Sequence, residues 1–221
     1  ATVTNFAPAL AHGALLQIDP VFKTDVNHLR ADSFVFTDVA LSGDTMMLMT
    51  TDKGSTRGYV YAFDHGGTEA PGSWGKAIWT NNGFGSGWGI TQDGMKVAVD
   101  GDFMVVGSGI SPGCGQTLYC SSAWVYSRDV PGDTTSAWTR LPNDLQPLDY
   151  SGNTHYADEY FGASVAIDGD TIVVGAPRSR VDDELAGAAF VFVRNEQTGQ
   201  WTQAAKLRSN NLQDSKFGMA V

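Results

Sequence analysis

The sequence is poor in charge and lacks long hydrophobic runs, and both shortages narrow its possible functions. Charged residues make up 17% of the 221 positions, and 24 Asp and Glu outnumber 14 Lys and Arg, so the formal net charge is −10. No basic stripe is present, which argues against a nucleic-acid partner. No apolar run approaches the roughly 18 residues of a membrane helix, and we therefore expect no membrane span.

Motifs that mark common catalytic sites are also scarce. The chain has no His-Glu-x-x-His pair and no phosphate-binding loop, and its four histidines are scattered over different predicted loops. No paired carboxylates lie in an evident apolar cleft. We therefore expect no catalytic residue, no cofactor and no enzymatic activity.

Only two cysteines occur, Cys114 and Cys120, in a glycine-rich segment. We predict that they form a disulfide closing a small ring, which would stabilise the fold by ~2 kcal/mol on loop-closure grounds. The alternative is two free thiols in a reducing compartment, whereas a zinc site lacks further ligands. A disulfide indicates a secreted, extracellular or lumenal protein, and a chain beginning at Ala1 fits a processed or truncated N-terminus.

Glycine and aromatic residues, by contrast, are abundant, with 26 Gly and 11% Phe, Trp and Tyr. This composition is typical of an all-β protein with many turns. The clearest signal lies at 161–177, where alternating residues from Phe161 and the run 172–174 predict two strands. Asp168 and Gly169 lie between them, and we predict a type I′ turn with both residues at positive φ.

Weaker copies of this hairpin occur upstream. The turn glycines Gly43, Gly101 and Gly169 follow Ser42, Asp100 and Asp168, with spacings of 58 and 68 residues. Each copy continues into a third and a fourth predicted strand. A period near 60 residues with four strands predicts the blade of a β-propeller. Because one blade cannot cover both its faces, we expect third-strand aromatics to pack between blades, namely Tyr61, Phe63, Trp124, Tyr126, Phe190 and Phe192.

The repeat divides the chain into a lead-in segment and a series of blades. We predict a lead-in at 1–31, blades at about 32–90, 91–157 and 158–213, and the start of a further blade at Phe217-Gly218. Closed propellers have four to eight blades. The expected architecture is therefore about three four-stranded antiparallel blades belonging to a larger propeller.

The third copy carries a family resemblance. Its Phe161-Gly162 and Gly175-Ala176-Pro177 flank the hairpin and resemble the FG-GAP repeat known from the integrin α-subunit propeller. The resemblance extends over about 32–221, but the first two copies depart from it. Their equivalent pairs are Val35-Phe36 with Thr50-Thr51, and Asp93-Gly94 with Gly107-Ser108. Such repeats are found in adhesion receptors and as accessory domains of secreted enzymes that cleave lipid anchors.

The same family often has a calcium-binding loop between its first two strands. Calcium takes six to eight oxygen ligands, and the two-residue turns of this chain are too short to surround an ion. We therefore expect no metal, and we interpret Asp44, Asp102 and Asp170 as turn residues that bind local backbone N–H groups. The acidic loop 182–184 is interpreted as solvated.

Loops between the second and third strands, at 50–57, 107–121 and 176–186, vary in length and should cluster on one rim. Variable loops on a rigid repeat often serve recognition, although tolerated insertions explain them equally well. We predict a non-enzymatic secreted or extracellular propeller that mediates protein interaction, adhesion or structural assembly through these loops or its blade edges. The alternatives are an accessory domain of a larger secreted hydrolase, or a glycan-binding module using Trp74, Trp79 and Tyr119.

Overall fold

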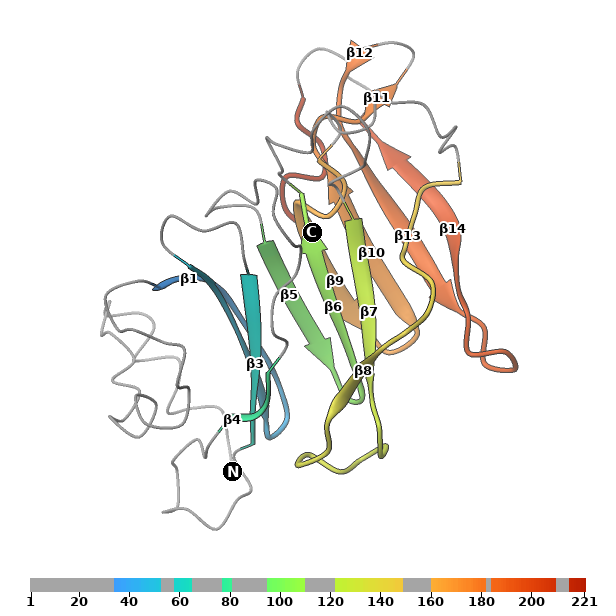
Figure 1. Ribbon diagram of the computed structural model, residues 1–221. Helices are drawn as coiled ribbons and strands as arrows, with labels where there is room; N and C mark the ends of the chain where they lie inside the picture. The colour runs from blue at the N-terminus through green and yellow to red at the C-terminus, as the bar shows by residue number, and fades with distance from the viewer. Residues whose placement is uncertain are drawn as a thin grey trace.

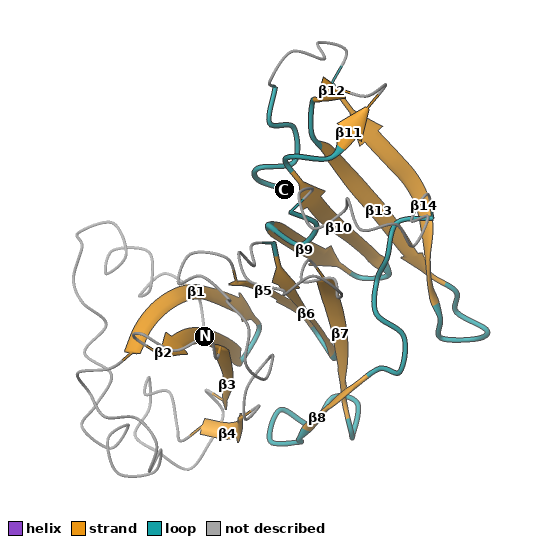
Figure 2. Ribbon diagram, turned by 45° about the horizontal axis from the view of Figure 1, so that its top comes forward, coloured by secondary structure: helices purple, strands orange, loops and turns teal. Residues whose placement is uncertain are grey.

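The computed structural model describes eight stretches of the chain. They are residues 34–52, 58–64, 77–80, 95–109, 122–148, 160–181, 184–209 and 215–221. Within these stretches every regular element is a strand and no helix occurs, as Figure 2 shows. The predicted all-β class is therefore confirmed. The predicted lead-in segment, 1–31, lies outside the described residues.

Three four-stranded antiparallel sheets, here called blades 1 to 3, follow one another along the chain (Figure 1). Blade 1 has the order β1 (Phe34–Ser42), β2 (Thr45–Asp52), β3 (Gly58–Asp64) and β4 (Ala77–Thr80). Blade 2 has the order β5 (Met95–Asp100), β6 (Phe103–Ser108), β7 (Ser122–Arg128) and β8 (Trp138–Arg140). Blade 3 has the order β9 (Ser164–Asp168), β10 (Thr171–Ala176), β13 (Ala188–Arg194) and β14 (Trp201–Arg208). A small hairpin of β11 (Arg180–Val181) and β12 (Glu184–Leu185) is inserted between β10 and β13.

Neighbouring blades meet through their first strands. β1 contacts β5 and β5 contacts β9, while β2 and β6 also reach the first strand of the following blade. Figures 1 and 2 show the three sheets side by side, with β5 between β1 and β9. Adjacent inner strands with outer strands spreading apart are the arrangement of propeller blades. The predicted four-stranded antiparallel blades are therefore confirmed, and these three blades do not close a ring.

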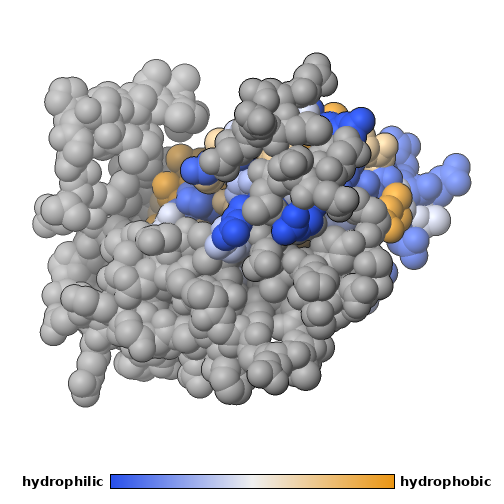
Figure 3. All heavy atoms as spheres, turned by 90° about the horizontal axis from the view of Figure 1, so that it is seen from above, coloured by the Kyte–Doolittle hydropathy of each residue, from blue (hydrophilic) through white to orange (hydrophobic). Residues whose placement is uncertain are grey.

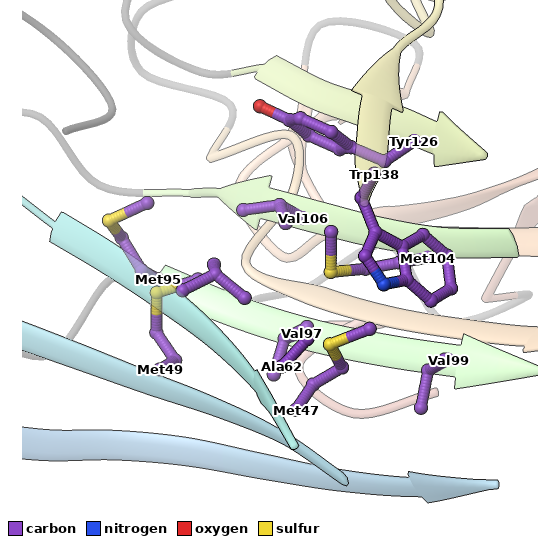
Figure 4. Close-up of a cluster of buried hydrophobic side chains, with 11 residues drawn as sticks. Met47, Met49, Ala62, Met95, Val97, Val99, Met104, Val106, Tyr126 and Trp138 are labelled. Atoms are coloured by element: carbon purple, nitrogen blue, oxygen red, sulfur yellow. The ribbon is translucent and has the colours of Figure 1, made fainter. Parts of the chain in front are cut away.

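Two clusters of buried side chains fill the spaces between the blades. The cluster between blades 1 and 2 (Figure 4) is rich in methionine, whose unbranched side chain fills irregular gaps. Its methionines are Met47, Met49, Met95 and Met104. Between blades 2 and 3, Val105 and Val125 pack with Phe190 and Phe192. The predicted packing of third-strand aromatics between blades is confirmed for these two phenylalanines and for Tyr126 of the first cluster.

The turn after each first strand lies one residue later than predicted. Asp168 pairs with Thr171 in the ladder, so the loop residues are Gly169 and Asp170. Gly169 has a φ of +52°, and neither aspartate has a positive φ. A positive φ at the first central position alone is the pattern of a type II′ turn, which favours glycine there. The predicted type I′ turn is therefore wrong.

The strand predicted from Phe161 begins three residues later, at Ser164. Tyr160 and Gly162 have φ values of +54° and +93°, and the Ala163 N–H donates to the Tyr160 carbonyl at 3.0 Å. An extended strand does not accommodate such φ values. Phe161 and Gly162 therefore form a turn that leads into β9.

Candidate interaction surface

The Phe161-Gly162 turn locks blade 3 onto blade 2. A Cβ on Gly162 would come within 2.5 Å of the Ser122 carbonyl and 2.8 Å of the Ser108 nitrogen, both in blade 2. A Cβ on Gly107 would in turn clash with the Gly162 carbonyl. Two glycines facing each other across the boundary therefore allow the backbones to meet.

The same joint recurs at the other face of blade 3. A Cβ on Gly218, which has a φ of +84°, would come within 3.0 Å of the Ala176 nitrogen and closer still to Ala188. A Cβ on Gly175 would clash with Gly218, and the Ser164 hydroxyl donates to the Gly218 carbonyl at 2.9 Å. The structure thus brings the first motif pair of one repeat onto the second motif of the preceding repeat.

The aromatic residue of the motif, Phe161, packs in the hydrophobic core. Phe161 is buried and packs edge-on against Phe190 and Phe192, with ring centroids 5.4 and 6.2 Å away. Pro177, at the end of the second motif, is buried as well. Phe217 is partly exposed, and Gly187 pairs with it in an isolated parallel bridge.

Hairpin turns of successive blades are connected by side-chain hydrogen bonds. The Gly101 N–H donates to the Ser42 hydroxyl at 3.1 Å, and that hydroxyl donates to the Asp100 carboxylate at 3.2 Å. The Gly169 N–H donates to the other Asp100 oxygen at 2.7 Å. In blades 1 and 2, the residue before the turn glycine thus accepts a hydrogen bond from the turn glycine of the next blade.

The turn aspartates bind arginine rather than local backbone. Asp102 accepts from Nε of Arg128 at 3.2 Å and from the distant Gly132 N–H at 2.8 Å. Asp170 accepts from Nη1 of Arg194 at 3.2 Å. The predicted local role is therefore wrong for both residues, because the third strand places a cation beside each turn.

Both arginines also cross to the preceding blade. The buried Arg128 donates to the Thr45 hydroxyl of blade 1. The guanidinium carbon of Arg194 lies 4.6 Å from the centre of the Phe103 ring of blade 2. Thr45 and Phe103 are each the first residue of a second strand. Sequence reasoning missed these arginines, although each is the last residue of the third strand of its blade. Each therefore follows its turn aspartate by one strand, a loop and another strand.

The connection between β10 and β13 is anchored at its base. The Ser179 N–H donates to the Ala176 carbonyl and the Gly187 N–H donates to the Ser179 carbonyl, each at 2.9 Å. The Phe217 N–H donates to the Ala186 carbonyl at 3.2 Å. These bonds fix both ends of the rim loop, residues 178–186, so that β11 and β12 project from a rigid base (Figure 1).

The end of the molecule that carries this rim loop faces the viewer in Figure 3, and its visible described residues are mostly hydrophilic. The exposed Arg178 donates to the Tyr160 hydroxyl at 3.0 Å, with its guanidinium 5.0 Å from the centre of that ring. Arg180 is exposed as well. The rim loop therefore presents cationic side chains beside an aromatic one.

Several predicted features lie outside the described residues. They are Cys114 and Cys120, most of the first two rim loops, Asp182 and Asp183, and the aromatics Trp74 and Tyr119. For Trp79 only the backbone is described.

The stretch 109–113, Gly-Ile-Ser-Pro-Gly, has the letters of a Gly-x-Ser-x-Gly nucleophile elbow, which sequence reasoning also missed. Its Ser111 lies outside the described residues as well.

Among the described residues, no group of three or more His, Cys, Asp or Glu side chains is placed to hold a metal ion. That part of the chain also has no helix of the length and apolarity needed to cross a membrane.

The FG-GAP repeat family matches residues 152–192. This chain contains an FG-GAP repeat. The match covers the Phe161-Gly162 turn, the β9–β10 hairpin and most of β13, and it is to the repeat, not to integrin α-subunits in particular. No curated protein matches the chain.

Proposed function

We propose that the chain is a non-enzymatic protein-interaction module of a secreted or extracellular β-propeller, and that its rim loops bind the partner. The observation that carries this proposal is the anchoring of the rim loop. Its ends are fixed by backbone hydrogen bonds at 2.9 Å, while β11 and β12 project from the sheet (Figure 1). A loop held in this way loses little conformational entropy on binding.

FG-GAP propeller domains commonly bind proteins, which supports a protein partner for this chain. The exposed Arg178 and Arg180 favour a partner surface with carboxylates, because guanidinium groups bind them bidentately. An adhesive or assembly role would use this rim, the blade edges or both.

The test is a binding screen of the purified chain against an immobilised panel of extracellular domains. A partner that the rim binds should lose affinity at least about tenfold with Arg180→Glu, as expected for reversal of an interfacial charge. Glu196→Lys is the matched control, since Glu196 is exposed in the turn between β13 and β14, at the opposite end of blade 3 from the rim loop. Partners equally sensitive to both variants, or to neither, would count against recognition by the rim.

A hydrolase is the competing function, and Ser111 gives it a specific candidate. The chain should be assayed on chromogenic ester, phosphodiester, glycoside and peptide substrates beside its Ser111→Ala variant. We expect no turnover above background from either protein. A rate that disappears on replacing Ser111 would refute the non-enzymatic proposal.

A further inference from the structure

One face of blade 3 carries exposed apolar side chains. Leu207 is 45% exposed and Val193 is 39% exposed on the face that points away from blade 2. Leu207 pairs with Ala189, just as Leu145 pairs with Ala123 in blade 2, yet Leu145 is only 3% exposed. Leu145 belongs to the cluster that blade 3 helps to form. On the equivalent face of blade 3, no described side chains of a following blade complete such a cluster.

A lead-in turn is already docked at this open face. Lys216 has a φ of +49°, and the Met219 N–H donates to its carbonyl at 3.1 Å. Tyr160 has the same left-handed conformation and accepts from Ala163 at 3.0 Å, directly before β9. Because Gly218 is seated on Gly175 as Gly162 is on Gly107, the entry to a joint like that between blades 2 and 3 is in place.

Two polar residues of blade 3 also lack, among the described residues, the hydrogen-bond partners that the equivalent residues of blades 1 and 2 have. Asp168 occupies the turn position at which Asp100 accepts the N–H of Gly169, and among the described residues Asp168 has no such donor. Thr171 is exposed at the position equivalent to Thr45, which receives Arg128 of the following blade.

We propose that the open face of blade 3 is an acceptor for one further blade of the same repeat, entering through Phe217-Gly218. The position of Asp168 requires a glycine N–H at the first turn position of that blade, and Thr171 fits an arginine at the end of its third strand. Its apolar face covers Val193 and Leu207. This acceptor face is separate from the rim loop, so the two proposals stand or fall independently.

The experiment extends the full chain by one repeat. A second copy of residues 163–221 is joined after Gly218, because this copy carries its own Gly169 and Arg194. The reporter is Val193→Cys in the original blade 3, with Cys114 and Cys120 replaced by serine in every protein. Its reaction rate with Ellman's reagent is compared in the original and the extended chain, with Val130→Cys as the control because Val130 is 55% exposed in the β7–β8 turn.

We expect the thiol at 193 to react at least about tenfold more slowly in the extended chain, because docking buries it, whereas the control thiol at 130 reacts equally in both. Asp168→Ala should raise the rate at 193 in the extended chain at least about threefold and leave it unchanged in the original chain. Leu207→Cys is a second reporter should the first variant itself hinder docking. Equal rates in both chains for both reporters would overturn the acceptor face. If Asp168→Ala left the rate at 193 in the extended chain unchanged, the proposed hydrogen bond to Asp168 would be overturned.

Discussion

The Asp100 carboxylate of blade 2 accepts a hydrogen bond from the Gly169 N–H of blade 3, with Oδ2 and N 2.7 Å apart. Its other oxygen accepts from the Ser42 hydroxyl of blade 1 at 3.2 Å. One turn side chain thus connects three consecutive blades.

Replacing Asp100 with alanine should destabilise the chain by about 1 kcal/mol, since two hydrogen bonds to a partly exposed carboxylate are lost. The measurement is the free energy of unfolding by urea titration. Asp168→Ala is the matched control, because Asp168 precedes the turn glycine in the same way but accepts no bond from a following blade in the described structure. Equal losses for the two variants would contradict the connection between blades.

The strands of this fold could largely be predicted from sequence, because the alternation in β9 and the apolar run in β10 are local patterns. The turn type could not. Asp168-Gly169 and Gly169-Asp170 share a glycine, and the pairing of Asp168 with Thr171 decides which pair forms the loop. That pairing depends on the whole ladder and not on the two letters.

The role of the motif glycines could not be predicted from local sequence patterns either. Gly162 and Gly107 lie 55 positions apart, and only their contact across a blade boundary explains why neither tolerates a side chain. Arg128 presented the same difficulty, because its hydrogen bond to Thr45 spans 83 positions. The motif predicted the fold, whereas the contacts between blades join residues too far apart in the sequence to be predicted from it.

Gly107→Ala should destabilise the chain by about 3 kcal/mol or more, because the new methyl group meets the Gly162 backbone, which cannot move without separating the blades. Gly199→Ala is the control for backbone strain alone, since Gly199 has a φ of +70° and a methyl group added there would meet nothing within 4 Å. It should cost about 1 kcal/mol. Differential scanning calorimetry of both variants tests the difference, and a smaller loss for Gly107→Ala than for Gly199→Ala would disprove the close joint.

Asp133 in the β7–β8 turn should titrate below the ordinary range. The Thr135 hydroxyl donates to its carboxylate at 2.7 Å and the Thr135 N–H at 2.9 Å, and with Arg128 nearby these bonds hold the pKa of Asp133 below its usual value. Because the folded pKa is lowered, its contribution to stability is present above the unfolded pKa and is lost as pH falls through the folded pKa. Carboxyl-carbon NMR should show a higher pKa in Thr135→Val and no change in Thr139→Val. An unaltered pKa in Thr135→Val would exclude the hydroxyl as the cause.

Arg128 is a buried cation at the boundary between blades 1 and 2. Its side chain is 2% exposed, pairs with Asp102, donates to the carbonyls of Asp133 and Thr134 at 3.2 and 3.1 Å, and lies 4.5 Å from the centre of the Trp138 ring. Replacement by methionine keeps much of the length but leaves buried acceptors unpaired, which costs about 3 kcal/mol.

Arg194→Met is the matched comparison, since Arg194 pairs with Asp170 in the same way but is 29% exposed. Its loss should be about 1 kcal/mol, because water can solvate the carboxylate that remains. Urea unfolding followed by tryptophan fluorescence measures both losses. If Arg128→Met were no more destabilising than Arg194→Met, the buried arginine would not be a major contact between the first two blades.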